Sequence, residues 1–429
     1  MSDSSRRQFI KNAFTGIAGS SLLLGAVKQE LTAKARTLAA NLDPNGNTGS
    51  EKYWELVKKS FSLKKDLLYF NNASLGPSPT LVLNAVDRFR RTLDSFPSKY
   101  MWGAWQKDKE EVRQKAAKLM GASEEEIALI HNTTEGMNII ASSLKLKKGD
   151  EVILADHEHP SGTIPWQYWQ ETKGIKLVRF KLPILPESPE EITNLYRKAV
   201  TRKTKVISMC HMVNTNGMML PVKEVSQFAH SKGILVAVDG AQAAGMISFS
   251  LNDLGCDFYA ASAHKWIFSP KGMGIFYARK ESQHLISPLI VAAGYEDKSI
   301  RRFENYNTRN LPELLGLGTA IDFLNVIGPE NIQKRVYELK KYFREQARQR
   351  PQLKIKTPSA DTLSAGIVTL EVEGKNVNDV RNILLEKYNI DCRPMNVFDL
   401  NGLRISLSIY ITRKDIDYLF DALDAIAKS

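Results

Sequence analysis

Cysteine is scarce in this chain, and both long apolar runs and blocks of like charge are missing. The 429 residues include only Cys210, Cys256 and Cys392, which are too few and too far apart for a disulfide framework or a zinc cage. No block of about five or more residues of one charge sign occurs, which excludes an acidic or basic tail. No stretch approaches the roughly 20 apolar residues of a membrane-spanning helix, so we expect no stable membrane span.

The composition is that of an ordinary globular protein. Hydrophobic residues make up 43% of the chain and charged residues 25%, which excludes disordered and collagen-like classes. The length predicts two or three domains with a sizeable core. Lysine and arginine exceed aspartate and glutamate by 12, but these basic residues are scattered and no helix-turn-helix pattern accompanies them. We therefore predict no nucleic-acid binding.

The first residues carry part of the positive charge. Residues 5–11 contain adjacent Arg6 and Arg7, and a modestly apolar stretch at 13–27 follows, interrupted by glycine and serine. This pattern resembles a twin-arginine export signal, with a small-x-small cleavage site at residues 33–35. It predicts a signal peptide over residues 1–35, recognised by the twin-arginine export machinery, and a periplasmic or exported protein. The alternative to the signal is an N-terminal amphipathic or membrane-lying segment, and the alternative location is the cytoplasm.

The pattern between residues 64 and 280 alternates between short apolar segments and helical periodicity. Near-continuous apolar strands separated by helices predict an α/β fold whose mostly parallel sheet is covered on both faces. Seven segments are strand candidates: residues 128–130, 151–154, 176–180, 206–209, 234–238, 258–260 and 274–277.

The pattern changes near residue 327. A helix over about 311–326 leads out of the alternating region, and two long helices separated by strands, such as 366–370, follow. We therefore predict an N-terminal arm at 36–63, a large domain at 64–326 and a smaller α+β C-terminal domain at 327–429.

The most informative segment follows the strand that begins at Phe258. The chain continues as Ser262-Ala263-His264-Lys265 into a loop that contains glycine. Ligands of open α/β sheets collect at the carboxyl ends of strands. A lysine there is placed to form a Schiff base with a carbonyl compound or with pyridoxal phosphate. Ser262 and His264 are placed to hydrogen-bond a phosphate. An ordinary surface lysine after a strand is the alternative.

A carboxylate ends the preceding, very apolar strand. Asp239 lies in the run Val238-Asp239-Gly240-Ala241-Gln242, and a buried carboxylate is costly unless it meets a cation. A protonated pyridine nitrogen is such a cation, and Gln242 is placed to reach the ring hydroxyl. Without Lys265 we would favour a helix-capping aspartate; with Lys265 on the adjoining strand end, the cofactor interpretation is favoured.

Two further loops lie at strand ends. Residues 132–136, which include Thr133 and Thr134, precede a helical run and suit either an anion site or a helix cap without ligand. Residues 156–160 hold two histidines and two acids. A metal site there lacks the helical spacing and the cysteine partners that would support it, so we favour His159 stacked on a ring.

Taken together, these motifs closely resemble the class V aminotransferase family of pyridoxal-phosphate enzymes. The resemblance begins at Tyr69-Phe70-Asn71-Asn72 and extends into the C-terminal domain, with the motifs in the family order. It implies a fold-type I enzyme with pyridoxal phosphate as cofactor.

The resemblance also implies a role for each matching residue. Lys265 is the Schiff-base lysine and proton-transfer base, Asp239 pairs with the pyridine nitrogen, and His159 stacks on the ring. Asn214 and Gln242 contact the ring hydroxyl, and Arg404 clamps the substrate carboxylate. The phosphate contacts are Thr133, Thr134, Ser262 and His264.

Departures from the family pattern reduce the number of candidate reactions. Family desulfurases carry a loop cysteine a few residues after the arginine that corresponds to Arg393, but residues 394–398 contain none. Cys392 precedes that arginine and is interpreted as a small buried side chain. A persulfide-forming desulfurase is therefore disfavoured. Residues 302–310 resemble the epimerase branch, with Asn307 in place of a glycine. By the same resemblance, Thr308 reaches the phosphate of a neighbouring subunit, which implies a homodimer with shared active sites.

We therefore predict a pyridoxal-phosphate enzyme that acts at the Cα of an amino acid, as an aminotransferase or an epimerase. A carbon–sulfur lyase is the alternative. A catalytically idle binding protein would be expected to have lost Lys265, Asp239 or Arg404, yet all three are present.

Overall fold

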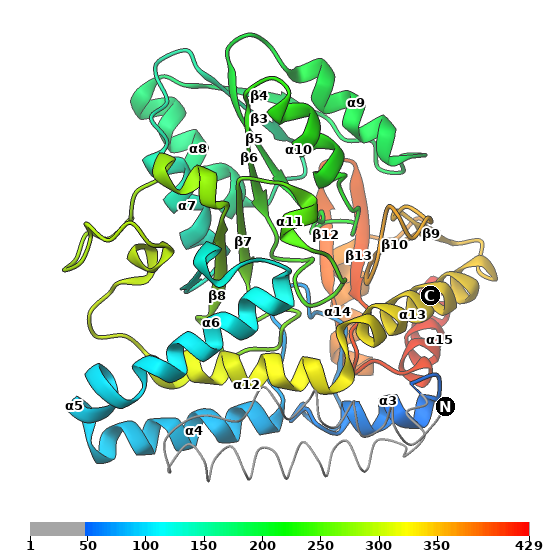
Figure 1. The fold of residues 1–429 in the computed structure, drawn as a ribbon. Helices are drawn as coiled ribbons and strands as arrows, with labels where there is room; N and C mark the ends of the chain where they lie inside the picture. Colours follow the sequence, from blue (N-terminus) through cyan, green and yellow to red (C-terminus); the bar gives the residue numbers. More distant parts are fainter. Residues whose placement is uncertain (1–47, 429) are drawn as a thin grey trace, which may run out of the picture.

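The computed structural model describes residues 48–428, so the predicted signal peptide lies outside the described residues. A seven-stranded sheet in the order β2-β8-β7-β6-β5-β3-β4 forms the centre of the molecule (Figure 1). Only β8 runs antiparallel to its neighbours. The prediction of a mostly parallel sheet from seven segments is confirmed. The strands are β2 (Ile127–Ile130), β3 (Glu151–Ala155), β4 (Lys176–Phe180), β5 (Thr204–Cys210), β6 (Leu235–Asp239), β7 (Phe258–Ser262) and β8 (Gly274–Ala278).

Successive strand residues face opposite sides of the sheet and enter two separate hydrophobic cores. In β3, Val152 and Leu154 pack in the core that α7 and α8 cover, whereas Ile153 and Ala155 pack in the larger core on the other face. Burial on both faces explains why the strands are continuously apolar. The connecting helices are α7 (Thr133–Ser143), α8 (Pro160–Lys173), α9 (Pro189–Ala199), α10 (Val222–His230) and α11 (Leu251–Leu254).

Three long helices pack together beside the larger core. Helix α12 (Leu311–Ile327) is buried on nearly all sides and packs against α4 (Thr80–Ser95) and α6 (Gln106–Met120) (Figure 1). Because so little of it faces solvent, apolar residues occur around most of its circumference. Within residues 48–428, no single helix is long and apolar enough to cross a membrane. The bent pair of α12 and α13 (Pro329–Arg348) passes that test of length and composition when the two are taken together.

The C-terminal region builds a second, antiparallel sheet in the order β12-β13-β10-β9. Its strands are β9 (Leu353–Ile355), β10 (Ile367–Val372), β12 (Arg393–Val397) and β13 (Leu400–Ser406). Three helices accompany it, α13, α14 (Val377–Tyr388) and α15 (Arg413–Lys428). The two long helices that the sequence predicts are α13 and α15. The shorter α14 was not predicted, because it buries only a short apolar face, formed by Val377, Val380 and Leu384.

The start of the described chain packs on this C-terminal region. Helix α3 (Glu51–Lys58) forms ion pairs through Glu51 with Arg335 and through Lys58 with Asp415. The short strand β1 (Leu68–Tyr69) pairs in parallel with β11 (Ile390–Asp391). The loop that follows β1 is thereby held between the two regions of the chain, where it contributes to the candidate site described below.

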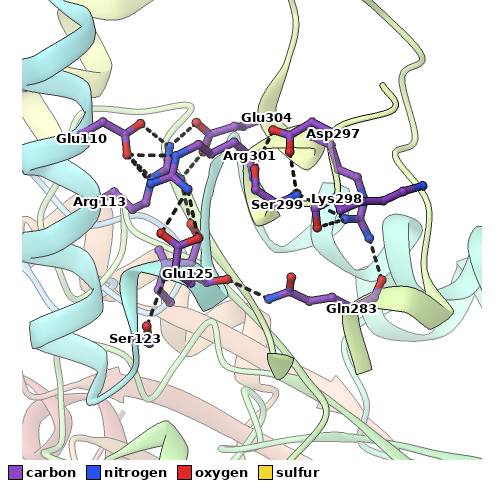
Figure 2. Close-up of polar contacts among 12 residues, drawn as sticks. Glu110, Arg113, Ser123, Glu125, Gln283, Asp297, Lys298, Ser299, Arg301 and Glu304 are labelled. Atoms are coloured by element: carbon purple, nitrogen blue, oxygen red, sulfur yellow. Dashed lines mark hydrogen bonds and ion pairs between the residues drawn. The ribbon is translucent and has the colours of Figure 1, made fainter. Parts of the chain in front are cut away.

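A buried ion-pair network fixes α6 to the 3-10 helix η4 (Ile300–Glu304) (Figure 2). The Arg113 guanidinium donates to both oxygens of Glu304, at 2.6 and 2.9 Å, and both side chains are fully buried. The backbone N–H of Leu129 in β2 donates to the same carboxylate at 2.6 Å. Burial by itself would raise the pKa of Glu304, but the hydrogen bonds and charge of Arg113 lower it to about 2.

We expect Glu304→Gln to destabilise the protein by about 3–5 kcal/mol, because it leaves the buried charge of Arg113 without its main partner. Urea unfolding at neutral pH measures this change. Glu281→Gln is the matched control: it breaks the exposed pair with Arg279 and should cost less than about 1 kcal/mol. If Glu304→Gln lowered the free energy of unfolding no more than Glu281→Gln does, the structural role of the network would be contradicted.

Candidate active site

The predicted catalytic residues meet at the carboxyl edge of the parallel strands. Asp239 is the last residue of β6, and Ser262 is the last residue of β7. Lys265 lies in the turn that follows β7, and His159 lies in the loop between β3 and α8. This edge is where ligands bind in open α/β sheets.

Lys265 is a buried amine whose backbone is held from the opposite side. The loop after β1 supplies the contacts: the N–H of Gly76 donates to the His264 carbonyl at 2.9 Å, and the Asn72 amide donates to the Lys265 carbonyl at 3.3 Å. A Cβ at Gly76 would lie 2.1 Å from that Lys265 oxygen, so only glycine permits this approach. The side chain of Lys265 therefore projects from a fixed backbone.

The charge of the Lys265 amine is disfavoured by its surroundings. Burial lowers the pKa of Lys265 to about 8, an effect that the negative charge of Asp239 opposes and the positive charges of Arg404 and Arg393 reinforce. A lysine with such a pKa holds a substantial unprotonated fraction near neutral pH. It is therefore suited to act as a nucleophile and as a base.

Asp239 and His159 lie on the two elements that border this amine. Asp239 is 4% exposed, and its Oδ1 accepts from the N–H of Ala241 at 3.0 Å. His159 caps the N-terminus of α8, and its Nδ1 accepts from the N–H of Ser161 at 3.1 Å. Burial lowers the pKa of His159, so the ring is a neutral imidazole suited to packing on another ring.

Three of the four predicted phosphate contacts lie at the N-terminus of α7 or bond to it, and the fourth, His264, lies two residues after Ser262. Ser262 Oγ accepts from the N–H of Thr133 at 3.0 Å, and the two hydroxyl oxygens are 2.8 Å apart. Thr134 Oγ1 donates to Ser161 Oγ at 2.8 Å. The Nδ1 of His264 is buried with no hydrogen-bond partner among residues 48–428, and burial lowers its pKa to about 4. Hydroxyls, a helix N-terminus and an unsatisfied ring nitrogen together suit an anion.

Arg404 of β13 lies on the other side of the site, with its charge unneutralised. It is 2% exposed and donates to the Asn214 carbonyl at 3.0 Å, to Asn71 Oδ1 at 3.3 Å and to Ser74 Oγ at 2.5 Å. Its Nε has no partner, and no carboxylate pairs with it in the described part of the chain. Burial lowers the pKa of Arg404 to about 9. The unused donor makes this guanidinium ready to bind a carboxylate.

The predicted cofactor contacts of three further residues stay predictions, and the structure shows where these residues lie. Both ends of the Gln242 amide are engaged, with the Ala73 carbonyl and the Trp266 indole, each at 2.9 Å. Asn214 offers its carbonyl to Arg404. Thr308 is exposed on the loop after η4.

Sequence reasoning assigned no role to three parts of this site. The loop after β1 supplies Asn71, Asn72 and Ser74, and its only signal is a cluster of small polar residues. Arg393 lies opposite Arg404 in the antiparallel pairing of β12 and β13. Glu158 was considered only as a member of a metal site. Within residues 48–428, no group of three or more histidine, cysteine or acidic side chains is placed to hold a metal ion.

Comparison with known proteins identifies the family. The model of the family described as aminotransferase class-V matches residues 68–419. The chain belongs to the class V aminotransferase family. It is 31% identical to isopenicillin N epimerase of Streptomyces clavuligerus over 395 residues, which cover 87% of this chain and 98% of that protein. It is also 31% identical to a probable cysteine desulfurase of Halalkalibacterium halodurans, over 83% of this chain and 92% of that one.

Solved structures share the fold. The cysteine desulfurase CsdA from Escherichia coli superposes with a TM-score of 0.76 at 24% identity, covering 87% of this chain and 98% of that one. A C-DES mutant with glycine covalently linked to the PLP cofactor superposes with a TM-score of 0.76 at 23% identity, covering 85% of this chain and 98% of that one. The prediction of a fold-type I enzyme with a mostly parallel central sheet is confirmed.

This enzyme family uses pyridoxal phosphate, and the described residues fit that cofactor. By the family pattern, Lys265 would hold its aldehyde carbon, Asp239 its ring nitrogen and His159 a ring face. Thr133 and Ser262 at the N-terminus of α7, together with the unsatisfied Nδ1 of His264, would suit its phosphate. The cofactor supplies an electron sink for bonds at the Cα of an amino acid. The chain is therefore a pyridoxal-phosphate enzyme of class V.

Proposed function

We propose that this enzyme moves a proton at the Cα of an amino-acid substrate, as an epimerase or an aminotransferase. The observation that carries the proposal is the buried amine of Lys265, which is close enough to Asp239 and to Arg404 for both of their charges to act on it. Arg404 binds and orients the substrate carboxylate. Lys265 Nζ then takes the Cα proton, and His159 keeps water from one side of the reacting group. Epimerisation would require a proton to reach Cα from the opposite face, and transamination would require Lys265 to deliver the proton to the cofactor instead.

The state of the cysteines favours proton transfer over sulfur transfer to the protein. All three cysteines of the chain are buried, and burial raises the pKa of the Cys392 thiol to about 12. Burial also raises the pKa of Cys210 and Cys256. A persulfide-forming enzyme needs an accessible thiolate, which supports the prediction that this chain is not a desulfurase of that kind.

A carbon–sulfur lyase is the second candidate. Elimination of a sulfur group from the substrate needs a base and a carboxylate clamp, which Lys265 and Arg404 provide, and it needs no protein thiol. The similarity to a probable cysteine desulfurase at 31% identity keeps sulfur-containing amino acids among the candidate substrates.

We also propose a homodimer with shared active sites. Exposed apolar side chains cluster at Leu289, Ile290, Val291 and Tyr295, and the Asn305 amide, hydrogen-bonded to the Ala293 carbonyl, ties this segment to the loop that carries Thr308. Burial of this surface against a second copy would place the exposed Thr308 near a neighbouring site. Twin-arginine export remains a proposal that rests on residues 1–35 alone.

The proposed reaction is tested with the cofactor-loaded enzyme in heavy water. A panel of L- and D-amino acids is incubated, and deuterium at Cα, optical inversion, keto-acid formation and sulfide release are scored in parallel. We expect deuterium incorporation with inversion for an epimerase, or with keto acid for an aminotransferase. Sulfide together with pyruvate would instead establish the lyase, and the absence of Cα exchange with every substrate would contradict proton transfer as the function.

A further inference from the structure

A second carboxyl group, that of Glu158, lies near Asp239 and has no role in the proposed reaction. Glu158 precedes His159 in the loop after β3 and is 8% exposed. Its Oε1 accepts from the N–H of Cys210 at 3.2 Å. A Cβ placed on Gly162 would lie 3.9 Å from Glu158 Oε2 and 3.6 Å from Asp239 Oδ2, so the two carboxyl groups border the same point of α8.

We infer that Glu158 is a positioning residue that acts through Asp239: its carboxyl group stays neutral, packs beside Asp239 at the same point of α8, and leaves Asp239 as the single negative charge for the ring nitrogen of the cofactor. The inference rests on the family's cofactor and not on which reaction the enzyme catalyses. Two carboxylates in one buried site do not both ionise without a large cost. One of the pair must therefore carry a proton.

The surroundings place that proton on Glu158. Asp239 lies close enough to Lys265 for its negative charge to favour the protonated amine, whereas Glu158 forms no ion pair within residues 48–428 and accepts only from the N–H of Cys210. Burial, followed by the negative charge of Asp239, raises the pKa of Glu158 to about 8. Glu158 is thus neutral below that pH and gains its charge as the pH rises through it.

The other groups that face Glu158 do not supply a competing charge at neutral pH. Burial raises the pKa of the Cys210 thiol in β5 and of the Tyr196 hydroxyl in α9 well above their ordinary values, so both are neutral. The charge of Arg179 in β4 favours an ionised Glu158, but its influence is smaller than that of burial, of Asp239 and of the hydrogen bonds from Cys210.

The test compares Glu158→Gln, a neutral side chain of the same shape, with Glu158→Leu, which removes the acceptor of the Cys210 N–H. The holoenzyme is loaded with pyridoxal phosphate labelled with 15N in the ring, and the 15N resonance is followed from pH 6 to pH 9.5. Cofactor affinity is measured at neutral pH on the same samples. Glu151→Gln is the matched control, because Glu151 is also buried but lies at the opposite end of β3.

If Glu158 is neutral, Glu158→Gln leaves the 15N chemical shift at neutral pH unchanged and keeps the cofactor affinity within about twofold of the wild type. It also abolishes the change in 15N chemical shift that the wild type shows near pH 8. Glu158→Leu weakens cofactor binding by about tenfold, as expected when a buried polar partner is lost. The control behaves as the wild type.

Three results would overturn the inference. A Glu158→Gln variant that loses the cofactor as strongly as Glu158→Leu would show that Glu158 acts as an anion. Identical pH profiles for wild type and Glu158→Gln would show that Glu158 does not titrate beside the ring. An unchanged cofactor affinity in Glu158→Leu would show that Glu158 does not act through Asp239. Should Glu158→Leu fail to fold, as thermal unfolding of the apo-protein would show, the isosteric glutamine variant still decides the question.

Discussion

Lys265→Ala is expected to abolish covalent capture of pyridoxal phosphate and to slow Cα-proton exchange by about 10³-fold or more. The variant removes both the amine that holds the cofactor and the base of the reaction, and a positioned base alone contributes roughly 10²–10⁴-fold. Borohydride reduction followed by peptide mass spectrometry locates the adduct, and the heavy-water assay measures the exchange. Lys271→Ala, six residues further along the same loop and solvent-exposed, serves as the control and should keep the adduct.

The same residue gives this prediction a pH signature. Because the buried amine of Lys265 has a pKa of about 8, the rate at which the apo-protein captures the cofactor should rise as the pH passes through 8 and then level off. An ordinary exposed lysine would give a midpoint about two pH units higher. A midpoint above pH 10, or an adduct on another lysine in the wild type, would contradict the assignment of Lys265.

The positions of the catalytic side chains were predictable because a parallel α/β sheet places the ends of its strands together. Asp239 and Ser262 each end a buried apolar strand, and those strands could be read from hydrophobicity alone. Adjacent parallel strands bring such ends to one edge of the sheet without any knowledge of the loops. The motif around Lys265 then specified which kind of ligand that edge suits.

Features that depend on long-range contacts were not predictable in the same way. Strand β8 is inserted between β2 and β7, and strand order follows from tertiary hydrogen bonds that leave no local pattern. The close approach of Gly76 to Lys265 joins residues about 190 positions apart in the sequence. The hydrogen bond from the Trp266 indole to the Gln242 amide is likewise a contact that the sequence does not indicate. The sequence gives the residue types and the hydrophobic periodicity, but it does not indicate which distant residue a side chain contacts.

Arg404→Gln is expected to lower kcat/KM by roughly a hundredfold or more, mainly through a higher KM. Two charge-assisted hydrogen bonds to a substrate carboxylate contribute about 3 kcal/mol or more, and a contact made equally in the ground and transition states appears in KM. Steady-state kinetics with the best substrate of the panel measures the loss. Arg381→Gln is the control in the same region: its pair with Asp391 at 3.7 Å is partly exposed and should leave kinetics unchanged.

The stability of the Arg404 variant distinguishes a binding residue from a structural one. The guanidinium is buried without a carboxylate partner in the described chain, and burial lowers its pKa to about 9, so its charge is a cost to the apo-protein that only a bound anion offsets. A glutamine retains amide donors for the neighbouring carbonyl and hydroxyl oxygens without that charge. We therefore expect the free energy of unfolding to stay within about 1 kcal/mol of the wild type or to rise. A loss of about 3 kcal/mol in urea unfolding would show instead that Arg404 holds the fold together, and the carboxylate clamp would then have to be sought at Arg393.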